Sequence, residues 1–260
     1  MTTNAPETLI QMSRALGQPE RRYVIIGEGN TSLRADDETF WVKSSGYQLA
    51  TISEEGFARI RFAPIMHMFD DPPANLTEER EILRSARADG GKAYPSVETS
   101  FHAMLLQDCG VQCIAHTHPI PINRLMCSAH AETFAKRRTC PDEAIVCGPE
   151  SVFVPYIDPG LPLAIEIRRR VHLYIEKHGE APKVILLANH GLIALAQSPT
   201  EALNITDMAI KGAEILWGAL AIGEPVFLSE AEVTHLCKRP DEIYRRKLWF
   251  NTASTKGSET

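Results

Sequence analysis

The sequence predicts a single α/β domain in which helices cover both faces of a central, mainly antiparallel sheet. Segments with the period of amphipathic helices alternate along the chain with short apolar runs typical of strands, and two pairs of these runs are joined by polar turns. A chain of 260 residues with 44% hydrophobic residues can bury one substantial core. No linker or internal repeat divides the sequence, so we expect one domain over residues 1–260 with a flexible polar tail at 252–260.

The N-terminal part of the chain is expected to give one helix and one β-hairpin. Pro6 suits the start of a helix, and apolar residues recur at helical spacing over 7–16. Two short runs, 23–26 and 39–42, are predicted to be strands, and the first is stopped by a glycine. We expect the polar segment 27–34 to be the turn between them.

The middle of the chain is expected to hold three helices and one strand. Ser53 and Thr77 are followed by glutamates, which is typical of helix starts, and the segment 67–75 between them is predicted to be a loop. Residues 98–106 have the pattern of an amphipathic helix. The apolar run 111–115 is predicted to be a strand that ends in the sequence His-Thr-His-Pro.

The last hundred residues are expected to hold three helices and a second hairpin. Residues 163–175 have a helical period. The apolar runs 183–188 and 192–196 flank an Asn-His-Gly turn, which predicts an antiparallel pair of strands. The segment 200–220 is predicted to be the longest helix, and a helical segment at 240–248 is expected to close the fold.

Charge and composition exclude several classes of protein. The formal net charge of −6 argues against nucleic-acid partners, whose affinity comes mainly from phosphate neutralisation. The longest stretch without a charged side chain, 184–200, is shorter than the ~20 apolar residues that a bilayer requires, so we expect no membrane partner. The first ten residues lack the pattern of a secretory signal, and we therefore expect a cytoplasmic protein.

Six cysteines are too few for a disulfide scaffold in a chain of this length. Cys109 and Cys113 form a C-x-x-x-C pair that could supply half of a zinc site if Cys127 joined it. Burial as small hydrophobic side chains is the favoured interpretation, because cysteine is among the most buried residue types.

Three histidines form a candidate metal site. His116 and His118 are separated by one residue, so in a strand both side chains point to the same face and reach one ion. Pro119 follows at once and places the pair at the end of the strand, a usual position for sites in α/β sheets. His190 lies in the turn of the second predicted hairpin. Three imidazoles suit a catalytic zinc ion with an open coordination position.

Glu98 is a candidate ligand or general base, because it stands near the start of a predicted helix that precedes the histidine pair. The alternative is simple complementarity of a carboxylate to the helix dipole. His102 lies on the same helix face, four residues further on, and could compete as a ligand. We favour a structural histidine that hydrogen-bonds nearby backbone.

Two small-residue turns are candidates for substrate binding. The segment 27–32 is rich in glycine but lacks both the Walker and the dinucleotide-binding patterns. The turn Lys43-Ser44-Ser45-Gly46 offers backbone N–H groups, two hydroxyls and an ammonium, which suits an anion such as phosphate or carboxylate. Ordinary hairpin turns are the alternative for each motif taken alone.

Five segments, taken in order, resemble the signature blocks of the class II aldolase/adducin family. They are GEGNTS at 27–32, KSSG at 43–46, PSVETSFH at 95–102, AHTHP at 115–119 and ANHG at 188–191. Five ordered blocks are specific for the family and much less so for the reaction. The sequences of these blocks most resemble those in the aldolase domain of rhamnulose-phosphate aldolase/short-chain dehydrogenase proteins. The fold implied is like that of the fuculose-phosphate aldolases.

The resemblance implies a class II aldolase-like α/β/α domain, usually a homotetramer, that holds a divalent metal. The metal is typically Zn²⁺, with Mn²⁺ or Co²⁺ left open by the sequence. The three histidines His116, His118 and His190 align with the family's ligands. Glu98 falls on the acidic position, which is described as a metal ligand in the resting site that swings away to act as acid/base.

The resemblance also implies roles for the polar turns. Asn30, with Gly29 beside it, lies on the residue that helps hold the enediolate. The cradle for a phosphate or terminal group of the substrate is matched by Ser44, Ser45, Gly46 and Ser96. Fuculose-type enzymes commonly have a second serine where Val97 stands, which removes one contact. Tyr244 is the candidate for the second proton donor, without support from a matching block.

The function expected from the sequence is that of a lyase of carbohydrate metabolism. A metal-dependent class II aldolase would cleave a ketose phosphate or a related hydroxy-ketone through a metal-stabilised enediolate. A sugar-phosphate 4-epimerase and a sugar-acid decarboxylase or dehydratase share this chemistry and remain alternatives. A non-catalytic adducin-like module is disfavoured, because the metal histidines and Glu98 are present.

Overall fold

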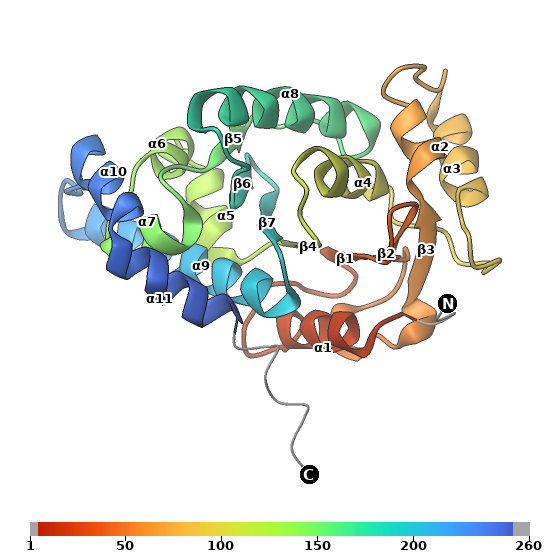
Figure 1. Cartoon of the computed structure of the whole chain (residues 1–260), viewed down its shortest axis with the longest axis horizontal. Coiled ribbons are helices and arrows are strands. Elements are labelled where there is room, and N and C mark those ends of the chain that lie inside the picture. The colour runs from red at the N-terminus through yellow and green to blue at the C-terminus, as the bar shows by residue number, and fades with distance from the viewer. Residues whose placement is uncertain (1–4, 252–260) are drawn as a thin grey trace, which may run out of the picture.

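The computed structural model describes residues 5–251 and shows a sheet of seven strands with helices on both faces (Figure 1). The strands are β1 (Asn30–Arg34), β2 (Thr39–Lys43), β3 (Phe57–Arg61), β4 (Cys113–Thr117), β5 (Val152–Val154), β6 (Val184–Leu187) and β7 (Gly191–Ala196). They are ordered β3-β2-β1-β4-β7-β6-β5, and every neighbouring pair is antiparallel except β5 and β6. The predicted α/β domain with a mainly antiparallel sheet is confirmed.

The helices form the two outer layers. They are α1 (Glu7–Leu16), α2 (Phe62–His67), α3 (Leu76–Ser85), α4 (Thr99–Asp108), α5 (Ile120–Met126), α6 (Ala131–Lys136), α7 (Pro141–Cys147), α8 (Leu161–His178), α9 (Pro199–Ile222), α10 (Glu230–Lys238) and α11 (Pro240–Asn251). In Figure 1, α4 and α8 lie above the sheet, and α1 and α9 lie below it. Each layer encloses its own apolar core, one with α2, α4 and α8 and the other with α1, α5 and α9.

Alternation along β4 decides which layer the histidines face. Cys113 and Ala115 belong to the core beneath α1 and α9, whereas Ile114 belongs to the core beneath α4 and α8. Side chains two residues apart share a face of a strand, so His116 continues the face of Ile114. The ring of His116 accordingly lies edge-on against Phe101 of α4, with the ring centroids 5.5 Å apart. The strand thus directs its terminal histidine toward the N-terminal half of α4.

The first hairpin is shifted relative to the prediction. Residues 23–26 do not form a strand, and the expected turn contains β1, which pairs with β2. The prediction was wrong because β1 is polar yet buried: the hydroxyls of Thr31 and Ser13 lie 2.7 Å apart, and Ser32 contacts a histidine of α4. Buried polar groups that have hydrogen-bond partners can occupy a central strand without an apolar pattern.

The helix predicted after Ser53 was also wrong. A single 3₁₀ turn, Glu54–Gly56, leads directly into β3. The alternation of β3 explains this outcome, since Phe57 faces one core and Ala58 and Ile60 face the other. The helix near Thr77 is confirmed as α3, although the side chain that caps it is Asn75. The short elements between 120 and 154 have no clear sequence period and were not predicted.

The remaining predicted elements are present within the described chain. The helices α1, α4, α8, α9 and α11 and the hairpin of β6 and β7 occupy the expected segments, with ends moved by a few residues. No helix in residues 5–251 combines the length and apolar composition needed to cross a lipid bilayer. The tail at 252–260 lies outside the described residues.

Candidate metal centre

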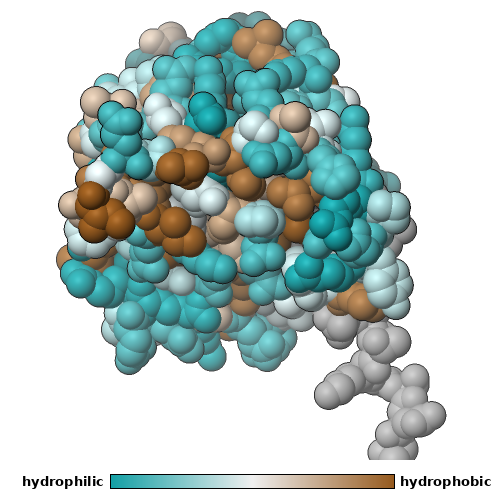
Figure 2. All heavy atoms as spheres, turned by 90° about the vertical axis from the view of Figure 1, so that its left-hand side faces the viewer, coloured by the Kyte–Doolittle hydropathy of each residue, from teal (hydrophilic) through white to brown (hydrophobic). Residues whose placement is uncertain are grey.

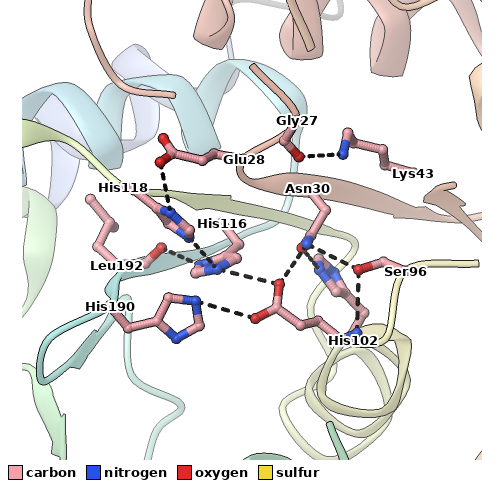
Figure 3. A network of polar contacts seen from close by, with 11 residues as sticks. Gly27, Glu28, Asn30, Lys43, Ser96, His102, His116, His118, His190 and Leu192 are labelled. Atoms are coloured by element: carbon pink, nitrogen blue, oxygen red, sulfur yellow. Dashed lines mark hydrogen bonds and ion pairs between the residues drawn. The ribbon is translucent and has the colours of Figure 1, made fainter. Parts of the chain in front are cut away.

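Three imidazole rings meet at one end of the central strands (Figure 3). His116 is in β4, His118 follows that strand, and His190 is in the turn between β6 and β7. One ligand nitrogen from each ring lies within 4.8 Å of the others. The Nε2 atoms of His116 and His118 are 3.1 Å apart. The antiparallel pairing of β4 with β7 brings the pair and the turn together.

The chemical state of these rings fits a divalent metal. The backbone carbonyl of Leu192 lies 2.9 Å from Nδ1 of His116, so this nitrogen carries the proton and Nε2 keeps its lone pair. Burial lowers the pKa of His116 to about 3 and that of His118 to about 2, so both rings are neutral. Nitrogens bound tetrahedrally to zinc at ~2.0–2.1 Å would lie ~3.3 Å apart, close to the separation in this pair. Three neutral imidazoles form a donor set suited to zinc and to related divalent ions.

Two glycines allow the strands and turns to approach this closely. A Cβ atom on Gly29, which has a φ of +68°, would lie 2.7 Å from the carbonyl oxygen of His116. A Cβ atom on Gly191 would lie 2.4 Å from the carbonyl oxygen of Thr117. Both distances are too short for non-bonded atoms, so the backbone beside the histidines requires glycine at each position. The predicted site residue Gly29 therefore has a steric role.

Glu98 connects the histidines with the polar side chains of β1. It is the N-cap residue of α4, and its carboxylate lies 3.3 Å from Nε2 of His190 and 3.4 Å from Nε2 of His116. Nδ2 of Asn30 donates a hydrogen bond of 2.6 Å to the same carboxylate. Burial raises the pKa of Glu98, an effect opposed by its interaction with His190 and by the Asn30 bond. The structure thus brings together the predicted ligand set, Glu98 and Asn30.

His102 holds Asn30 in this orientation. Its Nδ1 lies 2.7 Å from the hydroxyl of Ser32, and its Nε2 makes a short hydrogen bond with Oδ1 of Asn30. Because Oδ1 only accepts, Nε2 must donate and Nδ1 must accept from Ser32. Full burial lowers the pKa of His102 well below its usual value. The expectation that His102 bonds nearby backbone was wrong: its partners are two side chains of β1.

The predicted substrate cradle lies beside this network. Ser44 and Pro95 form an isolated antiparallel bridge that sets the two small-residue segments side by side. The N–H groups of Ser44 and Ser45 donate to backbone carbonyls, so these two amides are engaged. The hydroxyl of Ser44 is buried without a partner among the described residues, whereas Ser45 and Gly46 are exposed. The hydrogen-bond donors that remain available in this segment are therefore side-chain hydroxyls and not the amides of Ser44 and Ser45.

Ser96 and Lys43 supply further polar groups. The hydroxyl oxygen of Ser96 accepts from Nδ2 of Asn30 at 3.2 Å, so the hydroxyl hydrogen can still be donated. Nζ of Lys43 donates to the carbonyl of Gly27 at 3.0 Å. Burial lowers the pKa of Lys43 to about 8, against the opposing influence of Glu98. Figure 3 shows this ammonium beside the glycine turn, at the carbonyl of Gly27.

Tyr244 is not brought to this site within the described chain. It lies in α11 with 64% of its surface exposed, and α11 packs against α7, α9 and α10. The alternative zinc site is not formed either: Cys113 is buried and Cys127 is exposed. Among residues 5–251, the group of metal-ligating side chains that converges is the histidine triad.

Sequence reasoning missed Glu28 as a member of the site. One carboxylate oxygen accepts from the N–H of Ile25 at 2.8 Å, and the other lies 4.0 Å from Nδ1 of His118. The glutamate thereby fixes the turn that passes over the second histidine (Figure 3). The available signal was an acidic residue within the glycine-rich motif, two positions before Asn30.

An α/β/α domain with three converging histidines and an adjacent carboxylate is the arrangement of a metal-dependent enzyme. Residues 7–217 match the model of the class II aldolase and adducin N-terminal domain. The chain belongs to this family, as the resemblance of its five sequence blocks implied.

Individual relatives carry names for different activities. The chain is 26% identical over 216 residues to the uncharacterized oxidoreductase YuxG of Bacillus subtilis strain 168, covering 80% of this chain and 29% of that protein. It thus spans less than a third of that relative's length. It is also 26% identical over 237 residues to the 3-oxo-tetronate 4-phosphate decarboxylase of Haemophilus influenzae, covering 90% of this chain and 96% of the relative.

The fold is shared with an L-fuculose 1-phosphate aldolase of known structure. The TM-score is 0.66 at 21% identity, and the alignment covers 92% of this chain and 98% of that one. At this identity the likeness concerns the fold, and the family membership stands on the matched domain.

Proposed function

We propose that this protein is a metal-dependent lyase of carbohydrate metabolism, a class II aldolase that cleaves a ketose phosphate or a related hydroxy-ketone through an enediolate. The observation that carries the proposal is the position of the Glu98 carboxylate between two imidazole nitrogens and the amide of Asn30. A carboxylate held there has a metal centre on one side and a hydrogen-bond donor on the other, as proton transfer at an enediolate carbon requires.

His116, His118 and His190 would hold the metal, for which we propose zinc, with Glu98 as a further ligand in the resting site. A bound dication would supply Lewis-acid stabilisation of the negative charge that develops on substrate oxygens. The triad leaves room for such a role because three protein nitrogens leave a coordination position open to substrate. The buried, neutral state of the rings supports this assignment.

Residues of the chain itself account for most of the proton transfers. In retro-aldol cleavage the β-hydroxyl loses its proton, the adjacent C–C bond breaks to release an aldehyde, and the electron pair remains on the enediolate. Glu98 returns a proton to the enediolate carbon, and the amide of Asn30 donates a hydrogen bond to the oxyanion. In the reverse, aldol-addition direction a second group must donate a proton to the aldehyde oxygen, and in cleavage the β-hydroxyl gives up its proton at the same position. We assign this second proton donor to Tyr244, supplied by a neighbouring copy, since the tyrosine of the same chain is exposed on α11.

Substrate binding is assigned to the turns next to this centre. The hydroxyls of Ser44, Ser45 and Ser96, with the glycines Gly29 and Gly46, form the proposed cradle for a phosphate or other terminal group. The side-by-side arrangement of the two segments supports this role. The ammonium of Lys43 adds a positive charge beneath the turn.

A decarboxylase is the second candidate. The relative from Haemophilus influenzae, named for the decarboxylation of 3-oxo-tetronate 4-phosphate, aligns over nearly the full length of both chains. Loss of carbon dioxide from a 3-oxo acid and loss of an aldehyde from a hydroxy-ketone both leave an enediolate-type anion, so one site can serve either reaction. An epimerase would form the same anion and rejoin the fragments.

One experiment separates these reactions. The metal-loaded protein is incubated with a panel of ketose phosphates and 3-oxo sugar acids, and released aldehyde and carbon dioxide are measured in parallel. We expect aldehyde release that a chelator abolishes. Carbon dioxide without aldehyde would establish the decarboxylase instead, and inversion of a stereocentre without either product would establish the epimerase.

We also propose a homotetramer. Figure 2 shows apolar side chains exposed on the face of the molecule that carries α10 and α11. Ile222 and Val226, at the end of α9 and in the segment that leads to α10, are 90% and 89% exposed. Contact with further copies would bury such surface and would bring α11, with Tyr244, toward a neighbouring site. Sedimentation velocity of the purified protein measures the assembly directly.

A further inference from the structure

His118 is held on two sides by the segment 23–28. Its backbone N–H donates to the carbonyl of Tyr23 at 2.8 Å. Its ring nitrogen Nδ1 faces the carboxylate of Glu28, whose Oε1 is 4.0 Å away (Figure 3). The hydroxyl of Tyr23 donates to Asp207 of α9 at 2.7 Å, which ties the segment to a helix below the sheet. The segment therefore contacts both the backbone and the ring of one member of the triad.

The turn from Ile25 to Glu28 is closed by two reciprocal hydrogen bonds. The N–H of Glu28 donates to the carbonyl of Ile25 at 3.2 Å, and the N–H of Ile25 donates to Oε2 of Glu28 at 2.8 Å. Between them, Ile26 has a φ of +57°, which is unfavourable for a β-branched side chain. Such strain persists only where the surrounding structure enforces it, and it gathers at functional sites. The turn fixes one carboxylate oxygen and leaves the other facing His118.

Two neighbouring rings of the triad present the same nitrogen to one point. Nε2 of His116 and Nε2 of His118 lie 3.1 Å apart. A neutral ring that offers the lone pair of Nε2 to a metal carries its proton on Nδ1. The backbone carbonyl of Leu192 accepts that proton from His116. Nδ1 of His118 has no hydrogen-bond partner among residues 5–251, and the group that approaches it is the carboxylate of Glu28.

We propose that Glu28 is the acceptor for Nδ1 of His118 and thereby orients this ring toward the metal. The inference rests on the proposed function, because that function assigns a metal to the triad. A small rotation of the partly exposed side chain about its bond to Ile25 closes the gap of 4.0 Å. A carboxylate partner holds the ring in one tautomer and raises the basicity of its ligand nitrogen. Glu28 is thus a positioning residue that acts through His118.

The test compares Glu28→Gln with Glu232→Gln. Each glutamate accepts, through Oε2, from the N–H three residues before it, and glutamine can keep that bond through its amide oxygen. Glu28 lies beside the triad, whereas Glu232 is in α10, which packs against α7 and α11. Binding of Zn²⁺ and of Co²⁺ to the metal-free protein is measured by competition with a chelator at one pH. We expect Glu28→Gln to weaken binding roughly 10- to 100-fold and Glu232→Gln by about twofold or less.

A second comparison tests the route through the ring. When His118→Ala is already present, adding Glu28→Gln should change metal affinity by about twofold or less, because the ring on which Glu28 acts is gone. A loss as large as in the unaltered background would overturn the proposal. Denaturant unfolding of the metal-free proteins is the structural control, and we expect equal midpoints for Glu28→Gln and the unaltered protein. A lower midpoint would assign the loss of affinity to a weakened turn and would also overturn the proposal.

Equal affinity of Glu28→Gln and the unaltered protein, or an equal loss in both glutamine variants, would likewise overturn it. The titrations need no turnover, so their outcome is separate from that of the proposed reaction. A protein that bound Zn²⁺ with the help of Glu28 but released no aldehyde would contradict the aldolase and leave this role intact. A protein that bound Zn²⁺ equally well without the Glu28 carboxylate would contradict this role alone. Absence of metal binding in the unaltered protein would contradict both.

Discussion

Asn30 of β1 lies directly opposite His116 of β4 in the antiparallel register of the central sheet. The pairing of the two strands fixes the distance between the ring of His116 and the amide of Asn30. Because Asn30 also donates to Glu98 at 2.6 Å, the sheet register sets the geometry of the carboxylate as well. The backbone pairing of β1 with β4 thus places these residues, and the side-chain hydrogen bond then orients the carboxylate.

The hydrogen bond from His102 should be needed to orient Asn30. Replacement by phenylalanine fills the buried space but removes both bonds, so the amide of Asn30 is free to rotate away from Glu98. We expect kcat to fall roughly 10- to 100-fold, the size of effect produced by a misplaced group, with the metal content unchanged. Steady-state kinetics and elemental analysis measure the two quantities.

Two further variants distinguish positioning from a general structural role of His102. Glutamine at this position can donate to Asn30 and accept from Ser32, so His102→Gln should recover part of the activity. Adding His102→Phe to Asn30→Ala should cost little beyond Asn30→Ala alone, because the two residues act as one unit. Fully additive losses would show that His102 acts elsewhere.

Glu98→Gln should retain the metal and lose most of its turnover. Glutamine keeps the size of the side chain but cannot accept or deliver the proton at the enediolate carbon, and loss of a general acid/base typically costs about 100- to 10,000-fold in rate. Single-turnover measurements with metal-loaded protein test this expectation. A variant that kept its turnover would place proton transfer on another residue.

His116→Ala should remove metal and activity together. The ring is fully buried, and its Nε2 is one of the three converging nitrogens. Changes to residues that merely support a metal ligand already cost about 10- to 100-fold in metal affinity, so loss of the ligand itself should exceed that range. Metal content is measured by elemental analysis after dialysis. His172→Ala is the matched control, because His172 is half exposed and pairs with Asp108 away from the site.

The convergence of the three histidines could be predicted from the sequence because its geometry is local. Two histidines separated by one residue share a strand face wherever that strand lies, and His190 follows from a short hairpin turn between apolar runs. The partners of His102 could not be predicted, because they depend on α4 packing against β1, a segment without an apolar pattern.

Two glycines of the same motif offer a final, paired prediction. A methyl group at Gly29 requires an unfavourable positive φ and meets the His116 carbonyl at 2.7 Å, whereas one at Gly27 meets nothing within 4 Å. The backbone strain of ~1–2 kcal/mol and the overpacking of ~1–3 kcal/mol together predict that Gly29→Ala lowers the free energy of unfolding by about 2–5 kcal/mol. Gly27→Ala should stay within about 0.5 kcal/mol of the unaltered protein. Denaturant unfolding measures both, and equal stability of the two variants would mean that the glycine turn does not press against the strand that carries the metal ligand.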